Sequence, residues 1–220
     1  MIKIKNYDKK HGKICFVTDM SISLANAIRR SVLEIPIMAI DEVEISQNDS
    51  ALYDESLAHR LGLVPIKTEK TTKETKFRLK ETGPKMVYSS DLKPSIGTDY
   101  KLPITLLDNE QEIQLVAIAR IGKGIEHIKY SPGLMYYKHN LDGDIVNFVC
   151  IDESGKVSYD EKELKEKCEE EQIEKIKKLK EVNELLVCVE SWGQLEVKKI
   201  FTEAIDILDE NLSELNKAIK

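Results

Sequence analysis

The sequence lacks the features that mark several large classes of protein. No apolar run reaches the roughly 18 residues that a membrane-spanning helix needs, and residues 1–5 lack the apolar core of a signal peptide. The 33 lysines and arginines are outnumbered by 39 aspartates and glutamates, which gives a formal net charge of -6. Free-standing nucleic-acid binders usually display a basic surface. We therefore expect a soluble, cytoplasmic protein without a membrane anchor, in contact with DNA only indirectly, through a partner.

Cysteine is scarce and scattered along the chain. The four cysteines show none of the paired CxxC spacing through which zinc and iron–sulfur sites are usually recognised; they are Cys15, Cys150, Cys168 and Cys188. We expect four free, reduced thiols. Since 41% of the 220 residues are hydrophobic, the chain can bury the core of one large domain or two smaller ones.

A hairpin that leads into a short helix is predicted at the amino terminus. Residues 2–5 and 13–17 are typical of two strands joined by a polar turn. Ser23 is a candidate N-cap for a helix over residues 24–33. The expected helix turns Arg29 and Arg30 away from a buried face made of Leu24, Ala27, Ile28, Ser31 and Val32.

The middle of the chain is predicted to be mostly β. Pro36 ends the first helix and favours an extended chain before it, so residues 37–45 are predicted to form a strand. A short helix is expected over residues 53–61, because Gly62 and Pro65 follow it. The clearest later strand covers residues 113–120, while residues 83–103 are rich in proline, glycine and serine, as loops are.

The carboxy-terminal third is more regular. Residues 185–190 alternate as a strand, and a helix is expected from Val197 onwards. The apolar residues of this helix repeat as an unbroken a/d heptad seam: Phe201, Ile205, Leu208, Leu212, Leu215 and Ile219. The pattern alone leaves open whether the seam packs on the chain's own sheet or on a partner. Residues 160–181 mix lysine and glutamate densely, which predicts a solvated helix or a mobile charged arm.

Three strings carry a resemblance to a known family: NAIRR at residues 26–30, AID at residues 39–41 and HRLGLVP at residues 59–65. They resemble the third-largest subunit family of multisubunit RNA polymerases. Within it they are most similar to the D subunit of archaeal polymerases, and more distantly to the amino-terminal domain of the bacterial alpha subunit. The similarity resumes at residues 119–132, and again at residues 189–193 with residues 204–208.

The resemblance implies an α+β fold in two domains. A discontinuous dimerisation domain, made of strands plus two helices, is interrupted by a mostly β insert domain. We place the dimerisation domain at residues 1–45 and 134–220, and the insert at residues 46–133. The resemblance also implies that the carboxy-terminal helix packs against the equivalent helix of a partner, so the predicted interface residues there are Phe201, Ile205, Leu208, Leu212 and Leu215.

Two further pairs of interface residues are implied. In the family, the helix that matches Arg29 and Arg30 faces the second-largest subunit, and arginine suits interfaces because its planar fork makes several directed hydrogen bonds. His59 and Arg60 match a region of packing and partner contact. We therefore expect all four residues to contribute to subunit contacts.

The implied function is a non-catalytic assembly subunit, a scaffold, of a DNA-directed RNA polymerase in transcription. It carries no catalytic residues and no cofactor, although the complex is a nucleotidyltransferase. The implied partners are a small subunit similar to archaeal L, which completes a heterodimer, the second-largest subunit, and small subunits similar to N and P. Some relatives carry iron–sulfur or zinc-binding cysteine clusters. Residues 68–80 and 152–181 of this chain hold a single cysteine, so we predict neither an iron–sulfur cluster nor structural zinc.

Two alternatives stay open. Asp54, Glu55 and His59 lie at helical spacing and, with His127, could belong to a small soluble metal-dependent enzyme. Adjacent carboxylates on a helix point in different directions, however, and one histidine nearby supplies too few ligands for a closed zinc site. The other alternative is a homodimer of the bacterial alpha type; the absence of a linker and a DNA-binding domain after Lys220 argues against a full alpha subunit.

Overall fold

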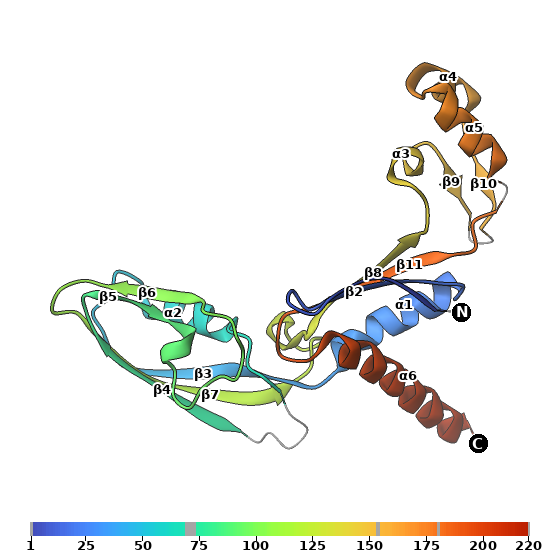
Figure 1. Ribbon diagram of the computed structural model, residues 1–220. Helices are drawn as coiled ribbons and strands as arrows, with labels where there is room; N and C mark the ends of the chain where they lie inside the picture. Colours follow the sequence, from blue (N-terminus) through green and yellow to red (C-terminus); the bar gives the residue numbers. More distant parts are fainter. Residues whose placement is uncertain (1, 69–73, 153–154, 180, 220) are drawn as a thin grey trace.

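The computed structural model describes residues 2–68, 74–152, 155–179 and 181–219. Their helices and strands form an elongated molecule with three lobes, each with its own apolar core (Figure 1). The mixture of helices with open antiparallel sheets confirms the predicted α+β class. Single turns of 3-10 helix link some of these elements, at Val32–Glu34, Ser89–Asp91 and Ile128–Tyr130.

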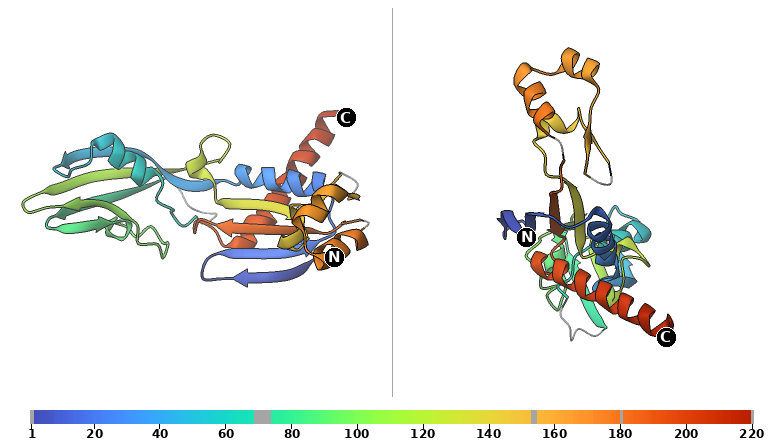
Figure 2. Two further views of the ribbon diagram at one scale, coloured as in Figure 1. Left: turned by 90° about the horizontal axis from the view of Figure 1, so that it is seen from above. Right: turned by 90° about the vertical axis from the view of Figure 1, so that its right-hand side faces the viewer.

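The first lobe is an antiparallel four-stranded sheet with two helices on one face (Figures 1 and 2). Its strands lie in the order β1 (Lys3–Asp8), β2 (Lys13–Thr18), β11 (Leu185–Ser191) and β8 (Gly133–His139). The covering helices are α1 (Ile22–Ser31) and α6 (Val197–Ile219). Because β2 and β11 are neighbours, both ends of the chain meet in one sheet. The hairpin, the first helix and the carboxy-terminal strand and helix are confirmed as predicted elements.

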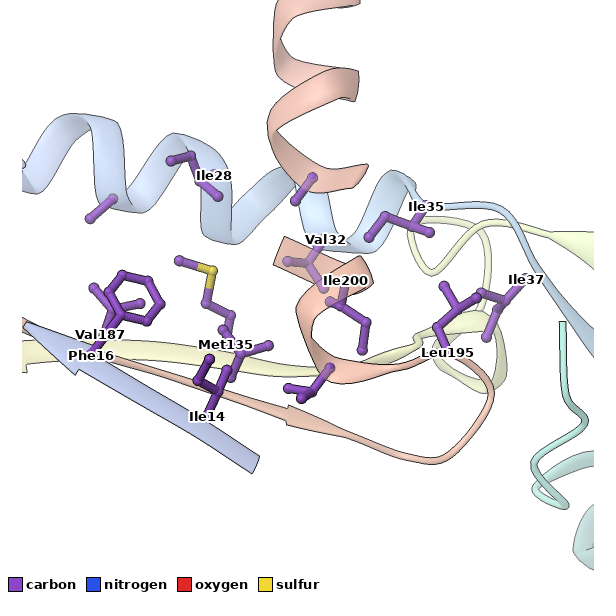
Figure 3. Close-up of a cluster of buried hydrophobic side chains, with 14 of the residues drawn as sticks. Ile14, Phe16, Ile28, Val32, Ile35, Ile37, Met135, Val187, Leu195 and Ile200 are labelled. Atoms are coloured by element: carbon purple, nitrogen blue, oxygen red, sulfur yellow. The ribbon is translucent and has the colours of Figure 1, made fainter. Parts of the chain in front are cut away.

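Alternation along the strands builds the core of this lobe (Figure 3). Successive strand residues point to opposite faces of a sheet. Ile14 and Phe16 of β2 therefore lie on the helix-covered face together with Val187 of β11 and Met135 of β8. The helices contribute buried side chains to the same cluster: Ala25, Ile28, Val32, Ile200 and Ala204.

The first helix begins earlier than predicted. Its N-cap is Ser21, whose side-chain oxygen accepts a hydrogen bond from the Leu24 amide at 3.3 Å. The prediction of Ser23 as the cap was wrong, because both serines can cap and only Ser21 lies where the chain enters the helix. Leu24 is exposed instead of buried, and Ala25 takes the core position.

The second lobe is mostly β, as expected for the middle of the chain. Its main sheet has the order β3 (Ile37–Asn48), β7 (Glu112–Gly122) and β4 (Thr75–Thr82), and β5 (Lys85–Tyr88) pairs with β6 (Pro103–Leu107). Helix α2 (Asp54–Gly62) packs on it through Leu57 and Leu61, which are fully buried. The strands predicted over residues 37–45 and 113–120, and the helix over residues 53–61, are confirmed.

Strand β3 connects the first two lobes. Ile37 and Ala39 pack in the core of the first lobe, while Met38 and Ile40 pack in the core of the second. Along its length β3 pairs with β7, in the sheet of the second lobe. The domain boundary at residue 45 stays a prediction.

The third lobe lies between β8 and β11 in the sequence. It contains α3 (Gly143–Val146), β9 (Cys150–Ile151), β10 (Val157–Ser158), α4 (Glu161–Lys167) and α5 (Glu170–Lys178). Residues 160–181 are therefore not one solvated helix: the chain ends α4 at Cys168 and turns back, so that Leu164 and Ile176 are buried against Ile145. Residues 69–73, 153–154 and 180, which fall in the segments expected to hold no cysteine cluster, lie outside the described residues.

Two of the four cysteines form a disulfide. Cys15 of β2 lies directly opposite Cys188 of β11, with their Cα atoms 4.2 Å apart, and their sulfur atoms are bonded. The prediction of four free thiols was wrong for this pair, because sequence spacing does not reveal which strands become neighbours. Cys150 and Cys168 are free.

Candidate partner interface

The sheet covers only the first part of α6. Val197, Ile200 and Ala204 are buried in the core of the first lobe, and Phe201 and Leu208 pack against it. The Phe201 ring meets Phe16 edge-on, with the ring centroids 5.0 Å apart. Beyond Leu208, all described residues of α6 are exposed, and the helix projects away from the sheet (Figure 1).

The predicted heptad seam is therefore divided. Phe201 and Leu208 belong to the chain's own core. The remaining seam positions form an exposed stripe, which consists of Ile205, Leu212, Leu215 and Ile219, with exposed fractions of 39, 56, 56 and 76%. A contiguous apolar stripe at heptad spacing is the surface that one helix presents to another.

Arg29 and Arg30 lie on the flank of α1, next to α6. Arg29 is half-buried and donates from Nε and Nη2 to Asn26 Oδ1, at 3.1 and 2.9 Å, which fixes its guanidinium along the helix. Arg30 is exposed, and the described part of the chain gives neither arginine an acidic partner. Two positive charges are thus available to a partner on the flank of the helix layer.

A polar contact also joins α6 to the turn that follows α1. Asn211 Nδ2 of α6 donates to Glu34 Oε2, in the 3-10 turn that follows α1, at 3.1 Å. This exposed bond lies near the point where the exposed half of α6 begins. The apolar stripe and the arginine flank therefore belong to one two-helix surface.

His59 and Arg60 lie elsewhere, on α2 in the second lobe. Arg60 Nη1 donates to the carbonyl oxygen of Ile104 at 2.5 Å, which attaches α2 to β6. The His59 side chain is exposed. The structure thus does not bring the predicted interface residues together in one patch (Figure 1), and the predicted partner contact of His59 and Arg60 stays a prediction.

The acidic residues of α2 do not form a metal site. Asp54 accepts a hydrogen bond from Asn48 Nδ2 at 2.7 Å, and Glu55 is exposed. His127 lies in a separate loop, where its Nδ1 accepts from the Lys129 amide at 3.2 Å. Within the described ranges, no three histidine, cysteine, aspartate or glutamate side chains converge as potential ligands. The geometry gives the metal-dependent enzyme no support.

A charged network that sequence analysis missed holds the loop after β7. Asp41 of β3 accepts hydrogen bonds from Lys129 Nζ at 2.6 Å and from the Tyr130 hydroxyl at 2.9 Å, and it pairs with Arg120 at 2.7 Å. The bond from Lys129, aided by Tyr130 and by the charges of Lys129 and Arg120, holds the pKa of Asp41 below its ordinary value. Gly122 is needed beside this network, because a Cβ there would lie 2.7 Å from the Tyr130 ring.

An apolar groove lies where three of the family-like strings meet. The HRLGLVP string, the loop after β7 and the turn after β11 come together around a space of about 480 Å³. Leu63, Ile128 and Trp192 line it and are exposed. Neither periodicity nor spacing could have placed these three segments side by side.

Comparison with known proteins agrees with these features. A profile described as the RNA polymerase Rpb3/Rpb11 dimerisation domain matches residues 16–212. The DNA-directed RNA polymerase subunit Rpo3 of Thermococcus kodakarensis is 32% identical, over 99% of this chain and 99% of the relative. Rpo3 of Archaeoglobus fulgidus is 31% identical over 100% and 98%. Rpo3 of Pyrococcus horikoshii is 40% identical over 63% of this chain and 60% of the relative. Among the described residues, none of the helices combines the length and the apolar character of a membrane span.

Proposed function

The chain belongs to the Rpb3/D family of archaeal RNA polymerase subunits, which carries the Rpb3/Rpb11 dimerisation domain, and we propose that it is the subunit on which assembly of the enzyme begins. The resemblance found in its sequence strings is thereby confirmed. In this proposal the chain carries no catalytic residues of its own. It pairs with a small L-like subunit and presents a platform to the second-largest subunit, in the cytoplasm.

The exposed stripe of α6 supports the pairing. The first half of α6 packs one side into the core of its own lobe, while the helix presents Ile205, Leu212, Leu215 and Ile219 to solvent. Such a helix needs a second apolar surface. The match to the dimerisation domain ends at Leu212, within this stripe. We infer that the equivalent helix of the L-like subunit covers it.

The arginine flank supports the platform. Arg29 and Arg30 lie beside the pairing helix, so a third subunit could contact them while the stripe is occupied. The groove around Leu63, Ile128 and Trp192 offers a further apolar surface away from the stripe. Small subunits similar to N and P complete the proposed set of partners.

Co-purification with the L-like subunit tests the pairing. The wild-type chain is expected to retain that subunit on an affinity resin, and Leu215→Glu is expected to lose it, because the new carboxylate would be buried unpaired in the helix contact. Ser213→Glu is the matched control, since it adds the same charge on the same turn but off the stripe. Equal retention by both variants would contradict the pairing surface.

Self-association is the competing outcome. If the stripe pairs with a second copy of this chain, analytical ultracentrifugation of the purified chain would show a dimer at micromolar concentration that Leu215→Glu abolishes. The proposal expects a monomer alone and a heterodimer on addition of the L-like subunit.

A further inference from the structure

The disulfide lies at the centre of a row of side chains that crosses the whole sheet of the first lobe. Asn6 of β1 is opposite Cys15, Cys15 is opposite Cys188, and Cys188 is opposite Tyr136 of β8. This row faces away from α1 and α6, because Ile14, Phe16, Val187 and Val189, on either side of the cysteines, point into the helix-covered core. The bond is thus on the face that the proposed partner helix does not cover.

The two sulfur atoms are enclosed although this face has no helix over it. Cys15 is 8% exposed and Cys188 is 3% exposed. Beside them, Lys13 of β2 and Glu190 of β11 form an ion pair at 2.5 Å, and Lys13 Nζ lies 5.9 Å from the centre of the Tyr136 ring. The folded sheet therefore largely shields both cysteines from a small thiol in solution.

The position of the bond in the chain gives it a mechanical consequence. It joins residues that are 173 positions apart, so the second and third lobes both lie inside the closed loop. Strand β2 belongs to the amino-terminal hairpin, and β11 leads into α6. Without the bond, hydrogen bonds, packing and the ion pair between Lys13 and Glu190 hold the hairpin to the strand that supports α6.

We propose that Cys15 and Cys188 form a redox-sensitive cross-link that controls how firmly the two ends of the chain are held in one sheet. Cross-linking removes conformational freedom from the unfolded chain, and the effect grows with loop length. The oxidised chain is therefore the more stable form, and reduction loosens the sheet under α6 while the second lobe, which has its own core, stays intact.

The chemistry is thiol–disulfide exchange with a low-molecular-weight disulfide such as oxidised glutathione. One cysteine thiolate attacks the glutathione disulfide and releases one glutathione thiol. The other cysteine then attacks the mixed disulfide and releases the second. The two cysteine sulfurs are oxidised, the oxidant becomes two thiols, and the two protons of the cysteines end on these products. A dithiol reductant reverses both steps.

The test compares the purified chain after incubation with oxidised glutathione and after incubation with dithiothreitol. Alkylation in denaturant, followed by mass spectrometry, should leave Cys15 and Cys188 without a label and without a glutathione adduct in the oxidised chain, and should label all four cysteines in the reduced chain. Thermal melting should occur roughly 10 °C higher in the oxidised chain. Hydrogen exchange should accelerate on reduction in β2 and β11 and remain unchanged in β7.

Two double variants locate the effect. Cys150→Ala with Cys168→Ala should keep the redox-dependent shift in melting temperature, and Cys15→Ala with Cys188→Ala should lose it. The comparison of oxidised and reduced wild type stands without any substitution, should the second variant fail to fold. Labels or glutathione adducts on Cys15 and Cys188 after oxidation, or equal melting of the two forms, would overturn the proposal. These outcomes are independent of any polymerase partner.

Discussion

At the scale of single residues, Asp41 determines how the loop after β7 is placed. Three donors from two segments converge on its carboxylate, which is only 14% exposed. Charge-assisted hydrogen bonds of this kind are stronger than neutral ones. The carboxylate thus holds Lys129 and Tyr130 against β3 and fixes one wall of the groove that contains Ile128.

Asp41→Asn is expected to lower the free energy of unfolding by about 2 kcal/mol at pH 7, because two cations would lose their shared anion. The folded-state pKa of Asp41 lies below its ordinary value, so its contribution is present above pH ~4 and is lost as pH falls through the folded pKa. Urea unfolding of wild type and variant should therefore converge at acidic pH. Asp209→Asn, on the exposed part of α6, is the control and should unfold like wild type. A difference that stays the same from pH 7 down to the most acidic condition measured would contradict the ionic role.

Arg30 offers a second prediction at this scale. Arg30→Glu reverses a charge on an exposed flank and should leave melting unchanged. Recruitment of the second-largest subunit by the heterodimer should weaken at least tenfold, since losing a charged partner in a buried contact costs about 2–5 kcal/mol. Lys165→Glu, the same reversal in the third lobe, should recruit normally. A reconstitution in which both variants recruit like wild type would reject the platform assigned to α1.

At the scale of elements, sequence periodicity predicted most helices and strands but not what covers them. The seam of α6 is continuous in sequence, yet the structure packs the half-buried Phe201 and Leu208 against the core and exposes Leu212 and Leu215. Spacing records only that the residues share a face. How far along the helix the sheet extends depends on strands from the other end of the chain, and no local pattern contains that information.

The effects of Leu208→Glu and Leu215→Glu on stability should show that the two halves of α6 differ in what supports them. Leu208 packs against the core of the first lobe, so a carboxylate there should destabilise the isolated chain by about 2–4 kcal/mol. Leu215 is exposed, so its substitution should change stability by less than about 0.5 kcal/mol. Circular dichroism melts of the two variants without any partner make the comparison. Equal melts would mean that the sheet supports both halves alike.

At the scale of the whole molecule, the chain leaves the terminal sheet twice and returns twice. It leaves along β3 and returns after β7 to form β8, then leaves again into the third lobe and returns as β11. At the base of the third lobe, the outgoing and returning segments are joined by a hydrogen bond from the Asn140 amide to the Glu184 carbonyl oxygen at 2.9 Å. Sequence patterns and resemblance predict the first excursion. For the second excursion, the sequence predicts only a charged helix or arm. The buried residues Ile145, Leu164 and Ile176 are too few and too scattered to show a period.

Because each of the three lobes has its own core, we expect the lobes to unfold independently. Ile176 is fully buried and the third lobe has few other buried side chains, so Ile176→Asp should place an unpaired carboxylate in a core too small to tolerate it. Hydrogen exchange, measured by mass spectrometry, should become fast across α3 to α5, while β2 and β7 keep wild-type protection, since proteins open in cooperative units that follow their packing. Lys177→Asp places the same charge on the exposed side of α5 and should leave all three lobes protected. If Ile176→Asp instead exposed β2 to exchange, the terminal sheet would depend on the third lobe, and the partner surface carried by α6 would depend on it as well.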